Sequence, residues 1–377
     1  MLDYSKCIKL ISTSFKDFKN NFAKEKEQIR NLIDTIKKID LKWIKNAYQS
    51  NFSEKVEILQ PVENEIIVED KKLTLGPIND LKENKWAFDL IKEKSVLGID
   101  TSELFTTHYY PFFVLLNVGI CYYNYKKNEY FETSSPSIYS KDTIEYVEDD
   151  RSMPLVINRL RLENELQTIT DLIKEKSINE CFTFFDESFS SNYLRSSNRS
   201  VIESIASNLK KNLDSYINFG LYPIGVIYTL SRGFVNFLKN VLDIKDINIS
   251  DKQIFNELLK PGQRSCIFKV NNLVTNIGGL SIFAFYLKIS ENNVLRIEFD
   301  ERIKEYADEI SKIVFLQSVI GGGYPLCMQR AHELAYISQE ERIYIYNLIE
   351  EELIKQGVKL NEFGFTRKQE RKIERII

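Results

Sequence analysis

The most informative absences in this chain concern paired cysteines and long apolar runs. Its five cysteines are scattered without a Cys-x-x-Cys pair, so neither a zinc site nor a disulfide framework is supported. No window reaches 18 uncharged apolar residues, and the N-terminus lacks the apolar stretch of a signal peptide. We therefore expect a cytoplasmic protein without a membrane span.

Charge and nucleotide-binding motifs narrow the class of protein further. The chain carries 51 basic and 54 acidic residues, a formal net charge of −3, so it has no general basic footprint for nucleic acid. Any contact with DNA has to come from a local patch or a channel, and the one conspicuous basic run is residues 367–375. The G-x-x-x-x-G-K-[ST] phosphate loop is also missing, which argues against an ATPase and leaves the supply of energy to a partner.

The apolar content, 43% of 377 residues, is ample for a packed core in one large domain with appendages or in two domains. Residues 15–39 carry large apolar side chains at 3–4 spacing, broken once by Glu25, which predicts a long amphipathic helix. Its apolar stripe packs either on the same helix of a second subunit or on its own domain. The short β-like pieces and prolines of residues 50–88 indicate an insertion or arm.

From Val96 onward the pattern changes to alternating strands and helices. The expected strands are 96–100, 112–124, 129–133, 181–186, 222–229, 265–270, 281–289 and 295–299. The expected helices lie near 155–177, 197–216, 231–243, 301–318 and 330–355. A hairpin-rich first half followed by strand–helix alternation predicts an α/β sheet with helices on its faces. We expect three regions, namely an N-terminal helical arm (1–88), a main domain (89–345) and a helical basic tail (346–377).

Two of the expected strands run directly into an aspartate. Residues 96–99 precede Asp100, and residues 182–185 precede Asp186. Such a carboxylate lies at the rim of a sheet, where a divalent ion can reach it, and two such strands side by side can form one metal site. Oxygen ligands favour Mg²⁺ or Mn²⁺ over zinc. For either aspartate alone, capping of the turn after the strand is the alternative.

A third carboxylate is expected on the helix that begins near residue 155. At 100° per residue, Glu165 falls within the inward apolar stripe of that helix, whereas Glu163 points to its flank. A buried acidic side chain needs a partner, and a metal ion is one. We therefore choose Glu165 over Glu163 as the third ligand, with an ion pair to Arg161, four residues earlier, as the alternative partner.

A Gly-Tyr-Pro segment with a downstream histidine adds a phenol and an imidazole. Tyr324 follows three glycines, which permit positive φ and a close backbone approach. His332 lies at what we expect to be a helix start, and it is a candidate metal ligand or proton donor, or else a hydrogen-bonded structural histidine. The other histidine, His108, is expected to be structural or solvent-facing. Arg232 is a candidate phosphate ligand or an exposed arginine at a helix start.

In this order, the elements resemble the NurA family of DNA-end-processing nucleases, which work with the hexameric ATPase HerA. That family's pattern is an Asp-Gly-Ser, a glutamate on a helix, a second Asp-Gly-Ser, and a Gly-Tyr-Pro followed by Ala-His. The matching residues here are Asp100, a glutamate within 159–166, Asp186, Tyr324 and Ala331-His332. The resemblance covers roughly residues 90–345, and it departs from the pattern where Thr101 and Glu187 replace the two motif glycines.

The resemblance implies a ribonuclease-H-like mixed sheet flanked by helices, and a metal-dependent DNA nuclease acting as an exo- or endonuclease on single- and double-stranded ends. It implies Mn²⁺ or Mg²⁺ held by Asp100, Glu165, Asp186 and His332, with Tyr324 positioning metal or phosphate. The implied partners are DNA, a HerA-like ATPase and a second copy of the chain, in end resection, repair or defence. The rival expectation is a catalytically weak adaptor that clamps DNA or the ATPase, because the motif glycines are replaced and the net charge is negative.

Overall fold

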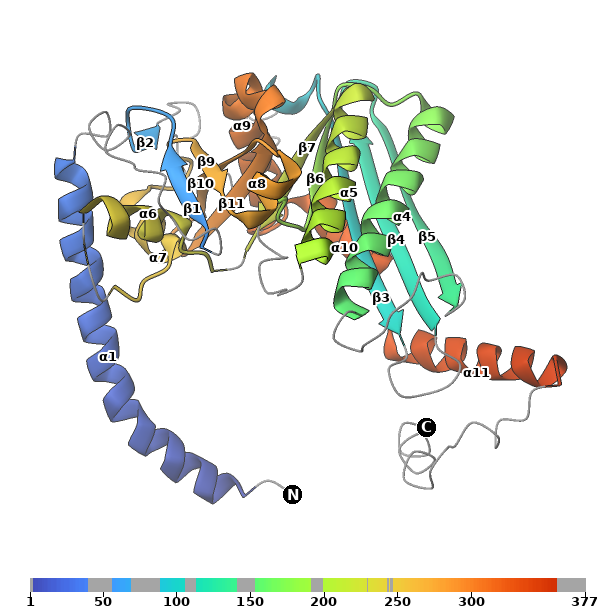
Figure 1. The fold of residues 1–377 in the computed structure, drawn as a ribbon, viewed down its shortest axis with the longest axis horizontal. Helices are drawn as coiled ribbons and strands as arrows, with labels where there is room; N and C mark the ends of the chain where they lie inside the picture. Colours follow the sequence, from blue (N-terminus) through green and yellow to red (C-terminus); the bar gives the residue numbers. More distant parts are fainter. Residues whose placement is uncertain are drawn as a thin grey trace. The chain divides into compact units, whose positions relative to one another are not determined.

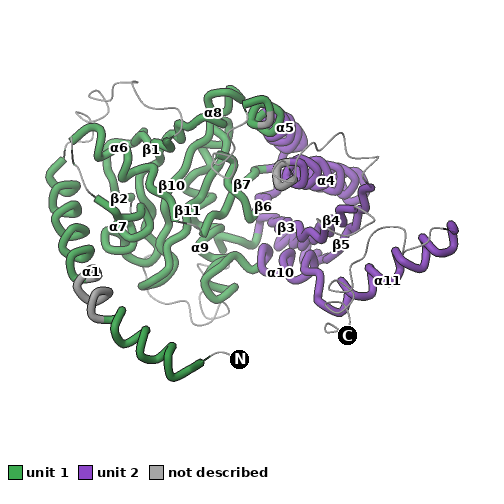
Figure 2. Tube along the Cα trace, turned by 60° about the horizontal axis from the view of Figure 1, so that its bottom comes forward, with its two compact units in different colours: residues 1–92, 186–206, 222–326 green, residues 93–185, 207–221, 327–377 purple. Residues whose placement is uncertain are grey.

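The computed structural model, drawn in Figure 1, divides into two compact units, which are coloured green and purple in Figure 2. Unit 1 comprises Met1–Lys92, Asp186–Ala206 and Tyr222–Leu326, and unit 2 comprises Glu93–Phe185, Ser207–Leu221 and Cys327–Ile377. The residues that the structure describes are 3–39, 56–68, 89–105, 113–140, 153–190, 199–228, 230–242, 244 and 247–357. His108 and the basic run 367–375 lie outside these described residues.

Unit 2 is built on a mixed sheet in the order β5-β4-β3-β6. β3 (Ser95–Phe105), β4 (Phe113–Asn124) and β5 (Glu129–Ser140) form an antiparallel meander, and β6 (Cys181–Phe185) lies parallel to β3. α4 (Met153–Lys176) lies between β5 and β6 in the chain and supplies the crossover that a parallel neighbour requires. This arrangement confirms the expected α/β class, a mixed sheet flanked by helices.

Helix α4 covers one face of this sheet. Its residues Ile157 and Leu160 pack against Val114 and Leu116 of β4 in a buried apolar cluster. Because alternate residues of a strand face opposite sides, this face of β4 belongs to the even-numbered positions. The odd-numbered positions are left to face a different helix.

That second helix, α10 (Leu326–Ala335), packs very closely on the other face. A Cβ at Gly98 of β3 or at Gly119 of β4 would lie 2.2 Å from a main-chain oxygen of α10. Glycine at these two positions therefore permits the helix backbone to touch the sheet. Asn117 of β4 completes the contact, because its Nδ2 donates at 3.0 Å to the main-chain oxygens of the last two residues of α10.

Two further helices contribute to unit 2. In the second half of α5 (Arg199–Asn218), Nδ2 of Asn212 donates to the main-chain oxygen of Leu162 in α4 at 2.7 Å. α11 (Gln339–Lys355) packs on the apolar ends of β3 and β4. The expectation of one helix over 330–355 was wrong, because Ser338 caps the N-terminus of α11 and forms a capping box with Glu341.

Unit 1 holds an antiparallel sheet in the order β1-β9-β10-β11-β7, and β8 pairs with both β10 and β2. Its strands are β1 (Ile58–Pro61), β2 (Ile67–Val68), β7 (Leu221–Ile227), β8 (Arg264–Ser265), β9 (Phe268–Asn271), β10 (Ile282–Ser290) and β11 (Asn293–Asp300). Its helices are α1 (Tyr4–Lys38), α6 (Gly233–Leu242), α7 (Asp251–Leu258), α8 (Leu273–Gly278), the 3₁₀ helix η1 (Glu301–Tyr306) and α9 (Ala307–Ile320). Parts of the expected arm, β1 and β2, are thus strands of this sheet.

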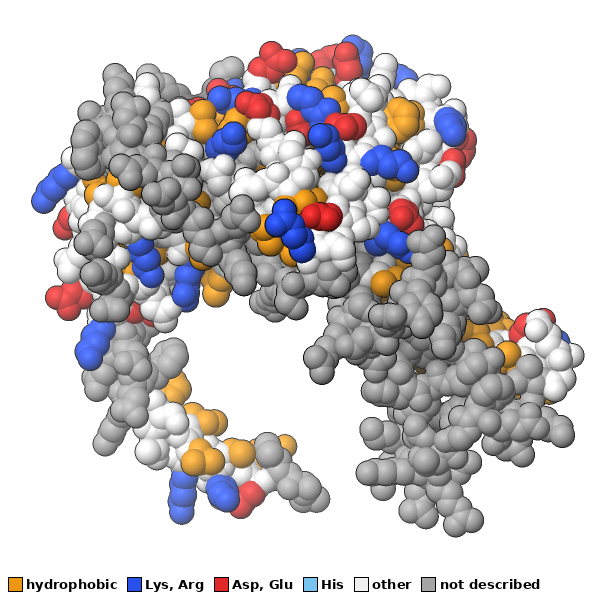
Figure 3. All heavy atoms as spheres, viewed as in Figure 1, with side chains coloured by type: hydrophobic (Ala, Val, Ile, Leu, Met, Phe, Trp, Pro, Cys, Tyr) orange, Lys and Arg blue, Asp and Glu red, His pale blue; other side chains and the backbone are white. Residues whose placement is uncertain are grey.

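Helix α1 has two halves with different surroundings. Its second half packs on its own unit against α7, and Nε2 of Gln253 in α7 donates to Glu25 at 2.6 Å. The buried side chains of that half are Ile29, Leu32, Ile33 and Ile36. Its first half carries exposed apolar side chains beside lysines (Figure 3). The exposed ones are Tyr4, Ile8, Leu10, Ile11 and Phe15.

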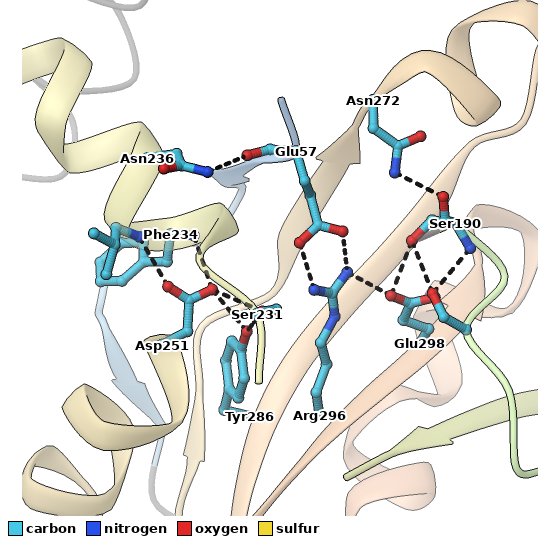
Figure 4. Close-up of polar contacts among 12 residues, drawn as sticks. Glu57, Ser190, Ser231, Phe234, Asn236, Asp251, Asn272, Tyr286, Arg296 and Glu298 are labelled. Atoms are coloured by element: carbon cyan, nitrogen blue, oxygen red, sulfur yellow. Dashed lines mark hydrogen bonds and ion pairs between the residues drawn. The ribbon is translucent and has the colours of Figure 1, made fainter. Parts of the chain in front are cut away.

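A buried polar network crosses the sheet of unit 1 (Figure 4). Arg296 of β11 donates to both carboxylate oxygens of Glu57 at 2.7 and 3.0 Å and forms an ion pair with Glu298. Burial in this network raises the pKa of Glu298. Every charged member has a partner, as a buried charge requires, so the network ties the chain before β1 to β11.

All five cysteines lie among the described residues, and none forms a disulfide. Of the helices in the described part of the chain, none combines the length and the apolar content that a bilayer span requires. The lack of disulfides agrees with the scattered positions of the cysteines in the sequence.

Candidate functional site

Asp100 occupies a break in the strand pairing of unit 2. The ladder between β3 and β6 ends at the Ile99–Phe185 pair, so Asp100 is the first residue of β3 beyond it. On the other side Asp100 pairs with Gly119 of β4, on the face where α10 lies. Its side chain is 8% exposed. A nearly buried carboxylate of this kind needs partners, and two helices supply them, α10 through His332 and α4 through Arg161.

His332 is the partner on the α10 side. Its Nδ1 lies 2.7 Å from Oδ2 of Asp100, while the imidazole is 62% exposed. An ionised carboxylate only accepts hydrogen bonds, so Nδ1 carries the proton and the Nε2 of a neutral ring keeps its lone pair. His332 lies in the last turn of α10 and not at a helix start, because the helix begins directly after Pro325.

Glu165 reaches the same strand from the opposite face. Thr101 Oγ1 donates to Oε1 of Glu165 at 2.6 Å, and the Glu165 side chain is 3% exposed. Glu163 is instead 52% exposed and lies 3.8 Å from Arg159. Glu165 therefore points inward, as the periodicity of the helix predicts, and Glu163 points outward. The sequence marked Thr101 only as a replaced glycine, and its contact with Glu165 was not anticipated.

Arg161 links the two carboxylates. Its Nε donates to Oε1 of Glu165 at 3.3 Å, and its Nη2 lies 3.7 Å from Oδ1 of Asp100. The ion pair that the sequence offered as the alternative partner of Glu165 is therefore present. It extends to Asp100, which the spacing along the helix did not predict.

The helix that carries His332 is also fixed to the edge of the sheet. Arg330 of α10 donates from Nε and Nη2 to the two carboxylate oxygens of Glu132 in β5, at 2.8 and 3.2 Å. The hydrogen bonds from Arg330, and a second from Tyr130, hold the pKa of Glu132 below its ordinary value. This two-pronged pair restrains α10 along the sheet.

Asp186 and Tyr324 meet in unit 1. Asp186 directly follows β6 and is exposed, and Tyr324 Oη donates to its Oδ1 at 2.6 Å. The loop before Tyr324 needs glycine, because Gly322 and Gly323 have φ of 70° and 122°. The expected role of the glycine run in shaping this loop is thus observed.

The segment after Asp186 is anchored in the core of unit 1. Ser188 Oγ, Phe189 N and Ser190 Oγ all donate to Glu298, at 3.0, 2.8 and 3.0 Å. Figure 4 shows Ser190 beside Glu298. Three donors on one buried carboxylate fix the backbone that follows Asp186. Glu187, which replaces the second motif glycine, lies nearly buried in this segment.

The side chains near Asp100 are of the kinds that bind a hard divalent ion, but they do not form a complete set of metal ligands in this structure. Within the residues that the structure describes, no three acidic, histidine or cysteine side chains gather closely enough to hold a metal ion. In unit 2, Asp100 contacts His332 directly and is linked to Glu165 only through Arg161. Carboxylate oxygens are ligands that suit Mn²⁺ or Mg²⁺. Arg232, the other candidate, is exposed immediately before α6 of unit 1.

Comparison with known proteins gives one family and several distant structures. The family model described as "NurA domain" matches residues 94–337, a range that contains all five candidate residues. The NurA nuclease from Sulfolobus solfataricus is 12% identical with a TM-score of 0.48, over 90% of this chain and 98% of that chain. A NurA bound to dAMP and manganese is 10% identical with a TM-score of 0.38, over 89% and 94%. An endonuclease V from Bacillus subtilis is 12% identical with a TM-score of 0.36, over 71% and 96%. No curated protein matches.

Proposed function

The chain belongs to the NurA family, and on this premise we propose that it is a metal-dependent nuclease that hydrolyses phosphodiester bonds of DNA. The observation that carries this proposal is the connected set of Asp100, Glu165 and His332 at the break in the β3–β6 ladder. These groups are acids, a base and metal donors placed together, and phosphodiester hydrolysis requires all three kinds.

We place Mn²⁺ or Mg²⁺ on Asp100, Glu165, Asp186 and His332. Such an ion, once bound, supplies a Lewis acid and lowers the pKa of the attacking water. The support for Asp186 comes from the sequence, because it follows an apolar strand and precedes Glu187-Ser188 much as Asp100 precedes Thr101-Ser102. The carboxylates then bind and orient, while Thr101 keeps Glu165 directed at the site.

His332 and Tyr324 have complementary tasks in this proposal. With its Nδ1–H held by Asp100, His332 acts through Nε2, either as a metal ligand or, when protonated, as the donor to the leaving oxygen. Metal-bound carboxylates supply no such proton. Tyr324 donates a hydrogen bond to Asp186 and so orients that carboxylate toward a metal ion or a phosphate.

The partners proposed are DNA, a HerA-like hexameric ATPase and a second copy of the chain. The ATPase follows from family membership together with the missing phosphate loop. The second copy is supported by the exposed apolar first half of α1, because contiguous apolar surface of this kind marks interaction sites. The process served is DNA end resection, in repair or in defence.

The test is cleavage of labelled linear single- and double-stranded DNA by the purified full chain with Mn²⁺, Mg²⁺ or EDTA. We expect metal-dependent cleavage that Asp100→Asn abolishes and that Glu103→Gln, an exposed carboxylate on the same strand, leaves intact. Tight DNA binding with no cleavage in either metal would instead support the adaptor.

A further inference from the structure

Arg161 stands out because it places a permanent positive charge among groups proposed to bind a divalent cation. It lies on α4 one turn before Glu165, and its side chain is 18% exposed. Its Nε is hydrogen-bonded to Glu165 at 3.3 Å, and its Nη2 is 3.7 Å from Asp100. The guanidinium cannot lose its proton in a protein, so this charge stays at every pH at which the fold survives.

The negative charges of Asp100 and Glu165 are therefore partly neutralised by Arg161 before any metal ion binds. Asp100 and Glu165 supply two negative charges, and Arg161 supplies one positive charge to both. A divalent ion on these carboxylates has to share them with the guanidinium, and two such ions roughly 3.5–4 Å apart would crowd it further. The site is thus better suited to one divalent ion and one guanidinium than to two divalent ions.

The two contacts of Arg161 differ in strength. The Nε–Glu165 contact is within hydrogen-bond range, whereas the Nη2–Asp100 separation is an ion-pair distance beyond that range. The Glu165 contact holds the stem of the guanidinium, so that its far end can exchange Asp100 for another anion. A planar fork of donors suits two oxygens of one phosphate.

We propose that Arg161 is a catalytic residue that supplies the second positive charge of the active site. When one divalent ion takes Asp100, the outer edge of the guanidinium donates to a non-bridging oxygen of the scissile phosphate. The charge that develops on that phosphate in the transition state is then met by one ion and one arginine. This inference rests on the proposed nuclease function.

Arg159 provides a matched control on the same helix. It lies two residues before Arg161, and its Nε is 3.8 Å from Oε1 of the exposed Glu163. Arg159→Ala therefore removes an equal charge from α4 at a side chain that pairs with Glu163.

The experiment combines Mn²⁺ titration without DNA, DNA affinity without metal, and single-turnover cleavage at saturating Mn²⁺, all on the full chain. We expect one Mn²⁺ per wild-type chain. Arg161→Ala should bind Mn²⁺ about tenfold more tightly, because a competing cation is gone. Its cleavage should fall about 100-fold, as for loss of one transition-state donor. DNA affinity should change less than about threefold, and Arg159→Ala should match wild type throughout.

The opposite signs of the two main effects distinguish this role from the alternatives. Wild-type cleavage by Arg161→Ala at saturating Mn²⁺ would overturn the proposal, and so would unchanged or weaker Mn²⁺ binding. If Arg161→Ala folds poorly, Arg161→Lys takes its place as the test variant, because lysine keeps the positive charge without the planar guanidinium. Its cleavage rate should lie below that of the wild-type chain and above the rate expected for Arg161→Ala. The Mn²⁺ titration does not depend on cleavage, so an inactive wild-type chain would refute the nuclease while leaving the competition between arginine and metal measurable.

Discussion

Thr101 and Glu165, 64 residues apart in the chain, are joined by a buried hydrogen bond of 2.6 Å between Oγ1 and Oε1. The residue that replaces a motif glycine therefore holds the carboxylate proposed as third metal ligand. The substitution adds a positioning contact to the site and is no sign by itself of a decayed one.

Thr101→Val removes this donor with little change of shape. The nearly buried Glu165 then loses one hydrogen bond, so we expect about 1 kcal/mol less stability and roughly tenfold slower cleavage. Thr101→Ser restores the hydroxyl and should restore both, as measured by denaturant unfolding and single-turnover rates. A Val variant as fast as wild type would remove Thr101 from the site.

Glu165→Gln keeps the size of the side chain and deletes its charge. A lost metal ligand is worth several kcal/mol in the transition state, so cleavage should fall by at least about 100-fold. Glu163→Gln, the matched change on the outer face of α4, should stay within about twofold. Equal effects of the two changes would show that the helix face, and not Glu165, matters.

Gly119→Ala tests the close contact of α10 with the sheet. The new Cβ would meet a main-chain oxygen of α10 at 2.2 Å, so the helix has to move and His332 moves with it. Overpacking of this kind lowers stability by about 1–3 kcal/mol, and cleavage should fall more than the melting temperature alone explains. Unchanged melting temperature and activity would contradict the contact.

The pair of Glu132 and Arg330 should make stability depend on pH. Because Arg330 lowers the folded-state pKa of Glu132 from its ordinary 4.5, the pair stabilises the fold fully above that value and loses its effect as pH falls below it. Glu132→Gln should therefore melt lower than wild type at pH 7, and the difference should vanish in acid. Glu129→Gln, an exposed change on the same strand, is the control. A difference that persists unchanged in acid would exclude the charge as its cause.

The first half of α1 is the surface expected to join two copies of the chain. Ile8→Glu combined with Phe15→Glu places charge on its exposed apolar side, so light scattering should report the mass of a single chain. Thr13→Glu adds a charge on another side of the helix and should leave the dimer intact. If the wild-type chain already has the mass of one copy, no dimer forms through this helix.

The parts of the fold that the sequence predicted are those with strong local patterns. The apolar run before Asp100 lies in β3, and the run before Asp186 lies in β6. The rotation of 100° per residue in a helix correctly predicted that Glu165 is buried and Glu163 exposed. The spacing of apolar residues within one segment is enough to predict its secondary structure and which of its side chains are buried.

Short elements and distant contacts were not predicted. α7 was not expected, although Ser250 and Gln253 form a readable capping box. The contacts of Arg330 with Glu132 and of Arg296 with Glu57 join residues 198 and 239 positions apart, and no periodicity encodes such pairs. The contact of Arg161 with Asp100 was not predicted for the same reason, because it depends on how α4 packs on β3 and β4.

The close contact between α10 and the sheet also means that the reactivity of two buried cysteines reports on the position of α10. Cys327 of α10 touches Gly98, whose strand neighbour is Cys121, and burial raises the pKa of Cys121 to about 12 and that of Cys327 as well. Only the thiolate is alkylated readily, so these two groups react at neutral pH when α10 lifts away. Cys7 on α1, which is partly exposed, gives the reference rate. We expect these two thiols to be alkylated more slowly than Cys7, at a rate set by how often the helix that carries His332 separates from the sheet.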